Sequence, residues 1–129
     1  MTELKRIKFI CSEYDKEKNL AKVTVKCGND FFIGYAKANG ADIERAGEFK
    51  GCLIAELKEN RKALKAQLKE IKRDYNTVHE FIEKCKQSKS FDENSCSAKM
   101  MFRQENILKK KVNLIHMGIA TIEKMLEAN

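Results

Sequence analysis

The chain has 129 residues, a formal net charge of +7 and a pI of about 9.2. Nowhere does it approach the roughly 18 consecutive apolar residues of a transmembrane helix, and its first residues lack the apolar run of a signal peptide. Its five cysteines form no CxxC pair, which is typical of reduced thiols in the cytoplasm. We therefore expect one cytoplasmic domain over residues 1–129, no membrane partner, and an acidic partner that matches the basic surplus.

An antiparallel meander of three β-strands is expected over residues 1–40. Apolar and polar residues alternate in residues 4–14 and 20–27, while residues 31–36 are rich in aromatic side chains. Turn-forming residues follow each run, at 15–19, at 28–30 and at 39–40. A sheet this small is stable only when one face is covered, so the helices or a second copy must cover it.

A heptad of apolar residues predicts one long helix over residues 49–86, after a short connector at 41–48. Its members recur at alternating steps of three and four residues, which is the spacing of a seam between packed helices. The members are Ile54, Leu57, Leu64, Leu68, Ile71, Tyr75, Val78, Ile82 and Cys85. Only Arg61 interrupts the series, and the chain contains no proline, the strongest helix breaker.

A second helix is predicted over residues 97–127, after a polar loop at 87–96. Its seam comprises Ala98, Met101, Leu108, Val112, Ile115, Ile119, Ile122 and Leu126. Two such helices joined by a short loop pack antiparallel, so the predicted fold class is α+β, a β-meander followed by a two-helix coiled-coil hairpin. This pairing places Ile71 near Val112. Glu105 interrupts the second series as Arg61 interrupts the first, and each is expected to reach out of the seam or to meet another chain.

The second helix has a wider apolar face than a two-helix seam needs. Ile107, Leu114, Gly118 and Met125 lie beside the seam at helical spacing. They are expected either to cover the back of the sheet or to form the interface of a homo-oligomer. Glycine in mid-helix costs about 1 kcal/mol relative to alanine, so Gly118 suggests the close approach of a bulky side chain, such as a tyrosine or phenylalanine of the sheet.

Lysines form the most specific polar feature, a stripe on one edge of the first long helix. Its members, Lys58, Lys62, Lys65, Lys69 and Lys72, follow steps of four and three residues. At about 1.5 Å per residue the stripe spans roughly 21 Å. Arg73 adds to it, and the antiparallel pairing brings Lys109, Lys110 and Lys111 towards its Lys72 end. Such a stripe either contacts a phosphate backbone or acidic protein surface without reading bases, or only keeps the helix solvated.

The strand region offers a second candidate surface. Phe31, Phe32 and Tyr35 with Lys22, Lys26 and Arg6 would form an aromatic and basic face of the kind that stacks bases. In a strand, Phe31, Ile33 and Tyr35 point to one side, while Phe32 and Gly34 point to the other. One of these sides must cover the core, and core packing is the competing explanation for the aromatic residues.

The sequence contains no constellation of catalytic or metal-ligating residues. His79 and His116 are its only histidines, and neither has a cysteine or carboxylate at ligand spacing. A nucleophile with its base, a phosphate-binding glycine loop and paired carboxylates are also missing from the sequence. We therefore expect a protein that is not an enzyme and needs no metal or cofactor.

Three hypotheses for function follow. The first is a binding or accessory protein whose basic hairpin acts on nucleic acid or on a nucleic-acid-handling protein, in the manner of small phage-type inhibitors. The second is a structural homo-oligomer assembled through the extra apolar strip of the second helix. The third is a binder of a small molecule or nucleotide between subunits, where Arg61, Tyr75 and Lys111 would converge.

Overall fold

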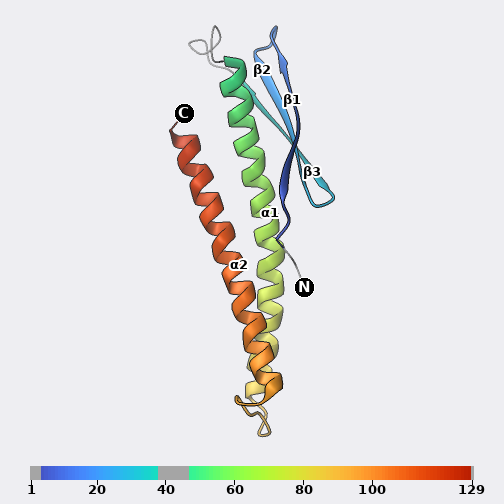
Figure 1. Ribbon diagram of the computed structural model, residues 1–129, viewed down its shortest axis with the longest axis vertical. Helices are drawn as coiled ribbons and strands as arrows, with labels where there is room; N and C mark the ends of the chain where they lie inside the picture. Colours follow the sequence, from blue (N-terminus) through green and yellow to red (C-terminus); the bar gives the residue numbers. More distant parts are fainter. Residues whose placement is uncertain (1–3, 38–46, 129) are drawn as a thin grey trace. The chain divides into compact units, whose positions relative to one another are not determined.

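The computed structural model describes residues 4–37 and 47–128 (Figure 1). Three strands, β1 (Ile7–Asp15), β2 (Leu20–Cys27) and β3 (Asp30–Lys37), precede two long helices, α1 (Gly47–Lys86) and α2 (Cys96–Glu127). The prediction of an α+β fold is confirmed, and both helices begin and end close to their predicted limits. The predicted turn at 39–40 and most of the predicted connector at 41–48 lie outside the described residues.

Contacts divide the chain into two compact units, each of which we describe by itself. One comprises Lys5–Lys65 and Gly118–Asn129, and therefore holds the sheet, the first part of α1 and the end of α2. We call it the sheet unit. The other comprises Met1–Leu4 and Ala66–Met117, and therefore holds the remaining parts of both helices and the loop that joins them. We call it the hairpin unit.

The sheet has the strand order β1-β2-β3, with antiparallel pairing of both neighbours. Gly28 closes the β2–β3 turn, where its φ of 64° suits the first central position of a type II′ turn. The β1–β2 turn holds Asn19 at a φ of 51°. In the same turn Oδ1 of Asp15 accepts hydrogen bonds from the backbone N–H groups of Glu17 and Lys18. The turn residues recognised in the sequence thus close both hairpins.

The inner face of the sheet is covered by α1. Every second residue of β2 is buried, namely Ala21, Val23, Val25 and Cys27. On α1 every fourth residue is buried, which defines a buried ridge of Gly51, Ala55, Glu59 and Ala63. Ala55 packs in one cluster with Val23 and Val25. A Cβ built on Gly51 would lie 3.3 Å from Cβ of Ala21, so this glycine lets the helix approach the strand closely.

In the hairpin unit α1 and α2 run antiparallel, side by side (Figure 1). Nδ1 of His79 on α1 lies 2.8 Å from Oε2 of Glu105 on α2, a contact that agrees with the predicted pairing of Ile71 with Val112. Ile71, Ile82 and Leu108 are buried in this unit. The second helix begins after Ser95, whose Oγ accepts a hydrogen bond from the backbone N–H of Ala98 at 3.2 Å, as an N-cap does.

Glu105, the charged residue in the second seam, finds its partner at the edge of the same hairpin. Its carboxylate hydrogen-bonds to His79 of the same hairpin, and the ring of His79 in turn stacks on Tyr75 with 5.8 Å between ring centroids. The imidazole reaches across the seam because antiparallel packing puts its position level with Glu105. A charged break in one helix is therefore satisfied by a polar residue at the edge of the other.

The bulky neighbour expected at Gly118 is a leucine of α1 and not an aromatic residue of the sheet. A Cβ built on Gly118 would lie 3.3 Å from Cδ1 of Leu64, so the close neighbour is a seam leucine of α1 rather than an aromatic residue of the sheet. Within the sheet unit the buried ridge of α1 covers the inner face of the sheet. Leu114 is 56% exposed, Met125 is exposed and Ile107 is half-buried.

Candidate functional site

The lysine edge is formed by Lys58, Lys62, Lys65, Lys69 and Lys72, all of which are exposed. Since α1 is helical from Gly47 to Lys86, steps of four and three residues keep these side chains on one edge of the helix. The first three belong to the sheet unit and the last two to the hairpin unit. The stripe predicted from the sequence is thus made of solvent-accessible ammonium groups.

Lys62 differs from its neighbours because it pairs with a buried carboxylate. Its Nζ lies 3.1 Å from Oε1 of Glu59, a side chain that is only 2% exposed. Removing a carboxylate from water is costly unless a cation or hydrogen-bond donor compensates, and Lys62 supplies that compensation. Lys62 therefore supports the fold, whereas the other lysines of the edge show no such pairing with a buried carboxylate in the described part of the chain.

Glu59 is buried beneath β3, against Gly34. A Cβ built on Gly34 would overlap the carboxylate and Cγ of Glu59, so glycine is the residue that leaves room for this side chain. The contact holds Glu59, and with it Lys62, where α1 meets β3. This buried glutamate was not singled out in the sequence, although its place in the series Gly51, Ala55, Glu59 and Ala63 marks a buried helix face.

A basic cluster occupies the hairpin unit. The register set by His79 and Glu105 puts residues 109–111 of α2 level with residues 73–75 of α1. The cluster comprises Lys69, Lys72, Arg73, Lys109, Lys110 and Lys111, of which all but the half-buried Lys111 are exposed. Glu70 and Asp74 are the acidic residues within 69–75 and 109–111, so these two segments carry six cations and two carboxylates.

The outer face of the sheet is the second candidate surface. Phe31, Ile33 and Tyr35 of β3 are 60%, 48% and 54% exposed. Their strand partners on β2 are Lys26, Thr24 and Lys22, which place the lysines on the same face. Nζ of Lys26 lies 5.4 Å from the centroid of the Phe31 ring. The core is covered by the other side of β3, with Phe32 and Ala36, so the aromatic and basic face lies open to solvent.

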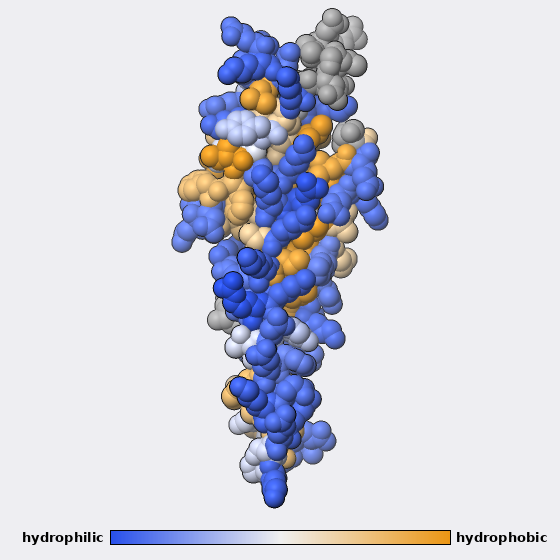
Figure 2. Space-filling model, turned by 180° about the vertical axis from the view of Figure 1, so that it is seen from behind, coloured by the Kyte–Doolittle hydropathy of each residue, from blue (hydrophilic) through white to orange (hydrophobic). Residues whose placement is uncertain are grey.

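Hydrophilic and apolar surfaces both occur on the molecule. In the view of Figure 2 hydrophilic side chains, in blue, cover most of the surface, and apolar side chains, in orange, gather in its upper and middle part. Phe31, Ile33 and Tyr35 of β3 are among the exposed large side chains of the sheet unit. Polar contacts to phosphates suit the first kind of surface, and stacking contacts suit the second.

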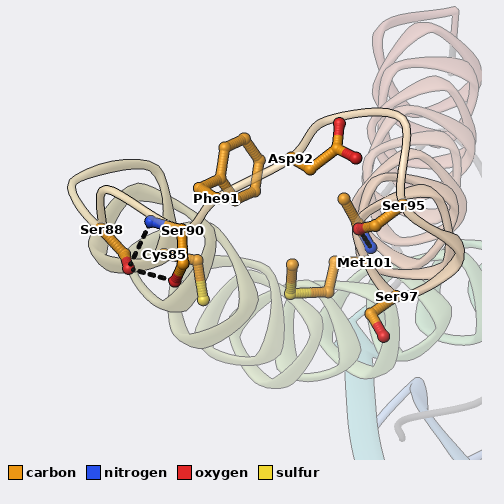
Figure 3. A pocket seen from close by; sticks show the side chains of 9 residues that line it. Cys85, Ser88, Ser90, Phe91, Asp92, Ser95, Ser97 and Met101 are labelled. Carbon is orange, nitrogen blue, oxygen red and sulfur yellow. Dashed lines mark hydrogen bonds between the residues drawn. The ribbon is translucent and has the colours of Figure 1, made fainter.

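A small cavity of about 230 Å³ lies where the chain reverses in the hairpin unit (Figure 3). It is lined by Cys85, Ser88, Ser90, Phe91, Asp92, Ser95, Ser97, Ala98 and Met101. Figure 3 shows Cys85 and Asp92 on different sides of it, and Oδ1 of Asp92 accepts a hydrogen bond from the backbone N–H of Asn94. The cavity is smaller than the roughly 300 Å³ at which ligand pockets begin, and its lining pairs no nucleophile with a base.

Among residues 4–37 and 47–128 no cluster of histidine, cysteine, aspartate and glutamate side chains is arranged to hold a metal ion. Within the same residues neither helix is apolar enough over its length to cross a bilayer. None of the five cysteines forms a disulfide. No protein-family model, curated protein or solved structure matches this chain. The two surfaces above are therefore the basis for an inference about function.

Proposed function

We propose that the protein is a non-enzymatic binding protein whose lysine edge contacts the phosphate backbone of a nucleic acid. The observation that carries this proposal is that all five lysines of the edge are exposed along one helix. The ammonium groups of Lys58, Lys65, Lys69 and Lys72, unlike that of Lys62, are not paired with a buried carboxylate among the described residues, and each can neutralise a phosphate and release its condensed counterions. The basic cluster of the hairpin unit extends the same chemistry to α2.

The lysine edge is suited to binding the phosphates of a nucleic acid and not to recognising its base sequence. Lysine is a compact point charge without the planar fork by which arginine recognises a guanine edge. The chain has 26 lysine and arginine residues against 19 acidic ones, so its long-range field also favours a polyanion. We therefore propose that binding through α1 depends strongly on salt and weakly on base sequence.

Removing four charges from the edge tests this proposal. We expect Lys58, Lys65, Lys69 and Lys72 all changed to Gln to weaken binding to a short DNA duplex at least about 100-fold at low salt, because each lost ammonium removes a counterion-releasing contact. Lys62 is left in place because it pairs with the buried Glu59. Fluorescence anisotropy of a labelled duplex measures the affinity.

The matched control removes four other exposed charges. Lys84, Lys89, Lys99 and Lys124 changed to Gln gives the same net charge, and all four side chains are exposed. If the two quadruple variants lose affinity equally, binding follows net charge alone and the lysine edge is not the binding surface. A wild-type protein that shows no salt-dependent binding to the duplex contradicts the proposal outright.

A second candidate function is assembly as a homo-oligomer. It is favoured by Leu114, a large apolar side chain of the predicted strip that is 56% exposed in the hairpin unit. If the strip is an interface, Leu114→Glu converts the oligomer to a monomer, because a carboxylate would be buried without a partner. Light scattering of the purified protein gives both masses. A wild-type monomer, or an oligomer that the substitution leaves intact, rules this strip out as an interface.

A further inference from the structure

The outer face of the sheet presents three apolar side chains in a row that the fold itself does not use. Phe31, Ile33 and Tyr35 are each about half exposed, although the opposite side of β3 packs on α1. Single exposed apolar residues are normal on a protein surface, but a contiguous row that includes two rings indicates a contact surface.

Cations accompany these rings. Lys26 lies opposite Phe31 in the strand register, with its Nζ 5.4 Å from the ring centroid, and Lys22 lies opposite Tyr35. On the far side of β2, Lys8 of β1 lies opposite Lys26. A ligand on this face therefore meets a flat apolar ring and an ammonium group side by side. Nucleotides combine a π-face with a phosphate and match this pairing.

We propose that the outer face of the sheet stacks the unpaired bases of a single-stranded nucleic acid on Phe31 and Tyr35, with Lys22 and Lys26 contacting the phosphates. This inference rests on the proposed function and specifies the class of nucleic acid. Phe31 and Tyr35 are four residues apart on β3, which separates them by about 13.6 Å. Stacked nucleotides of one strand advance by only about 3.4 Å. Bases that lie on the two rings are consequently not stacked directly on one another, which a single strand permits and an intact duplex does not.

Within the sheet unit one member of the lysine edge, Lys62, lies close to β3. Glu59 lies beneath Gly34, in the middle of β3, and its partner Lys62 is 64% exposed. Because β3 is an edge strand of the sheet, a nucleic acid that continues past this edge would pass towards α1.

A second copy of the chain is a poorer occupant of the face. In a two-fold sheet-on-sheet dimer the same patch meets itself, so the lysines of each copy face those of the other. Glu13 of β1 lies opposite Lys22 and offsets one of these charges, but Lys8 and Lys26 lie opposite each other beside Phe31, so burying them in this way would bring like charges together. Charge complementarity therefore favours a polyanion over self-association.

The test measures binding of labelled oligo-dT and of a short duplex to wild-type protein and to Phe31→Ala with Tyr35→Ala. We expect the double substitution to weaken oligo-dT binding about 10-fold or more for each ring lost, with duplex binding unchanged. Phe81→Ala, which removes an exposed ring from the hairpin unit, serves as the control and should leave both affinities unchanged. Tyr35→Phe keeps a stacking ring and should retain oligo-dT affinity. Circular dichroism establishes that each variant is folded.

Each outcome is informative. If the double variant binds oligo-dT as wild type does while the lysine-edge variant loses affinity, base stacking on the sheet is wrong and the proposed function stands. If wild type binds neither oligo-dT nor duplex, both fail. If the double substitution instead lowers the mass of a wild-type oligomer and leaves oligo-dT binding intact, the face binds a second copy and the inference is overturned.

Discussion

Gly34→Ala is expected to lower the free energy of unfolding by about 2 to 3 kcal/mol, although alanine normally suits a strand better than glycine does. The added methyl group would overlap the side chain of Glu59, which has no open space to move into because it is 2% exposed. Accommodation requires either that the carboxylate leaves its position beside Lys62 or that β3 moves away from α1. Urea unfolding followed by circular dichroism measures the change.

A second substitution shows whether this collision is the cause. Gly34→Ala combined with Glu59→Ala should be more stable than Gly34→Ala alone, because the atoms that the new methyl group meets are all beyond Cβ of Glu59. Gly118→Ala is the control, since its new methyl group would meet only the terminal Cδ1 of Leu64, which can rotate. That change should leave stability unaltered or raise it by up to about 1 kcal/mol through helix propensity. If the double variant is no more stable than Gly34→Ala alone, overlap with Glu59 is not the reason that alanine destabilises this position.

Leu108→Ala is expected to destabilise the protein by about 3 kcal/mol, within the range for buried leucines. Leu108 is fully buried in the hairpin unit, so the substitution leaves a cavity between helices whose close packing limits collapse. Met100→Ala removes an exposed side chain from the same helix and should change stability by less than about 0.5 kcal/mol. Chemical denaturation compares the two. Equal effects would mean that the seam of α2 is not packed as the structure shows.

The strands, the turns and the two helices could be predicted because each depends on local pattern. Alternation in β2 and the heptads of both helices fix which side chains are buried, and the chain length between the helices forces them to return antiparallel. The contact of His79 with Glu105 agrees with the register obtained by pairing the heptads. Local periodicity therefore determines much of this fold.

The buried ridge of α1 was harder to predict from the sequence, because its members are small or charged. Gly51, Ala55 and Ala63 contribute little to a hydrophobic pattern, and Glu59 resembles a solvated residue until β3 is placed above it. The sequence also left open which side of β3 covers the core, since Phe31 and Phe32 are equally apolar. Pairing with β2 decides it, because Phe31 shares a face with Lys26 whereas Phe32 shares one with Val25.

Of the candidate site residues, the exposed lysines followed directly from helical spacing, but the distinct role of Lys62 did not. Lys62 pairs with Glu59, which lies three residues earlier. Glu59 is buried because β3, a strand distant in sequence, covers it. The same long-range packing decides that Gly118 meets Leu64 and not the sheet. Side-chain roles set by contacts between elements are therefore the part that sequence spacing predicts least well.

The salt dependence of duplex binding tests the proposed role of the lysine edge most directly. For each phosphate contact the logarithm of the binding constant falls with the logarithm of salt concentration at a slope of about −0.9. Changing Lys58, Lys65, Lys69 and Lys72 to Gln should make the slope shallower by up to about 3.6, while the control set of four lysines leaves it nearly unchanged. An identical slope for wild type and the lysine-edge variant would contradict a phosphate-binding role for α1.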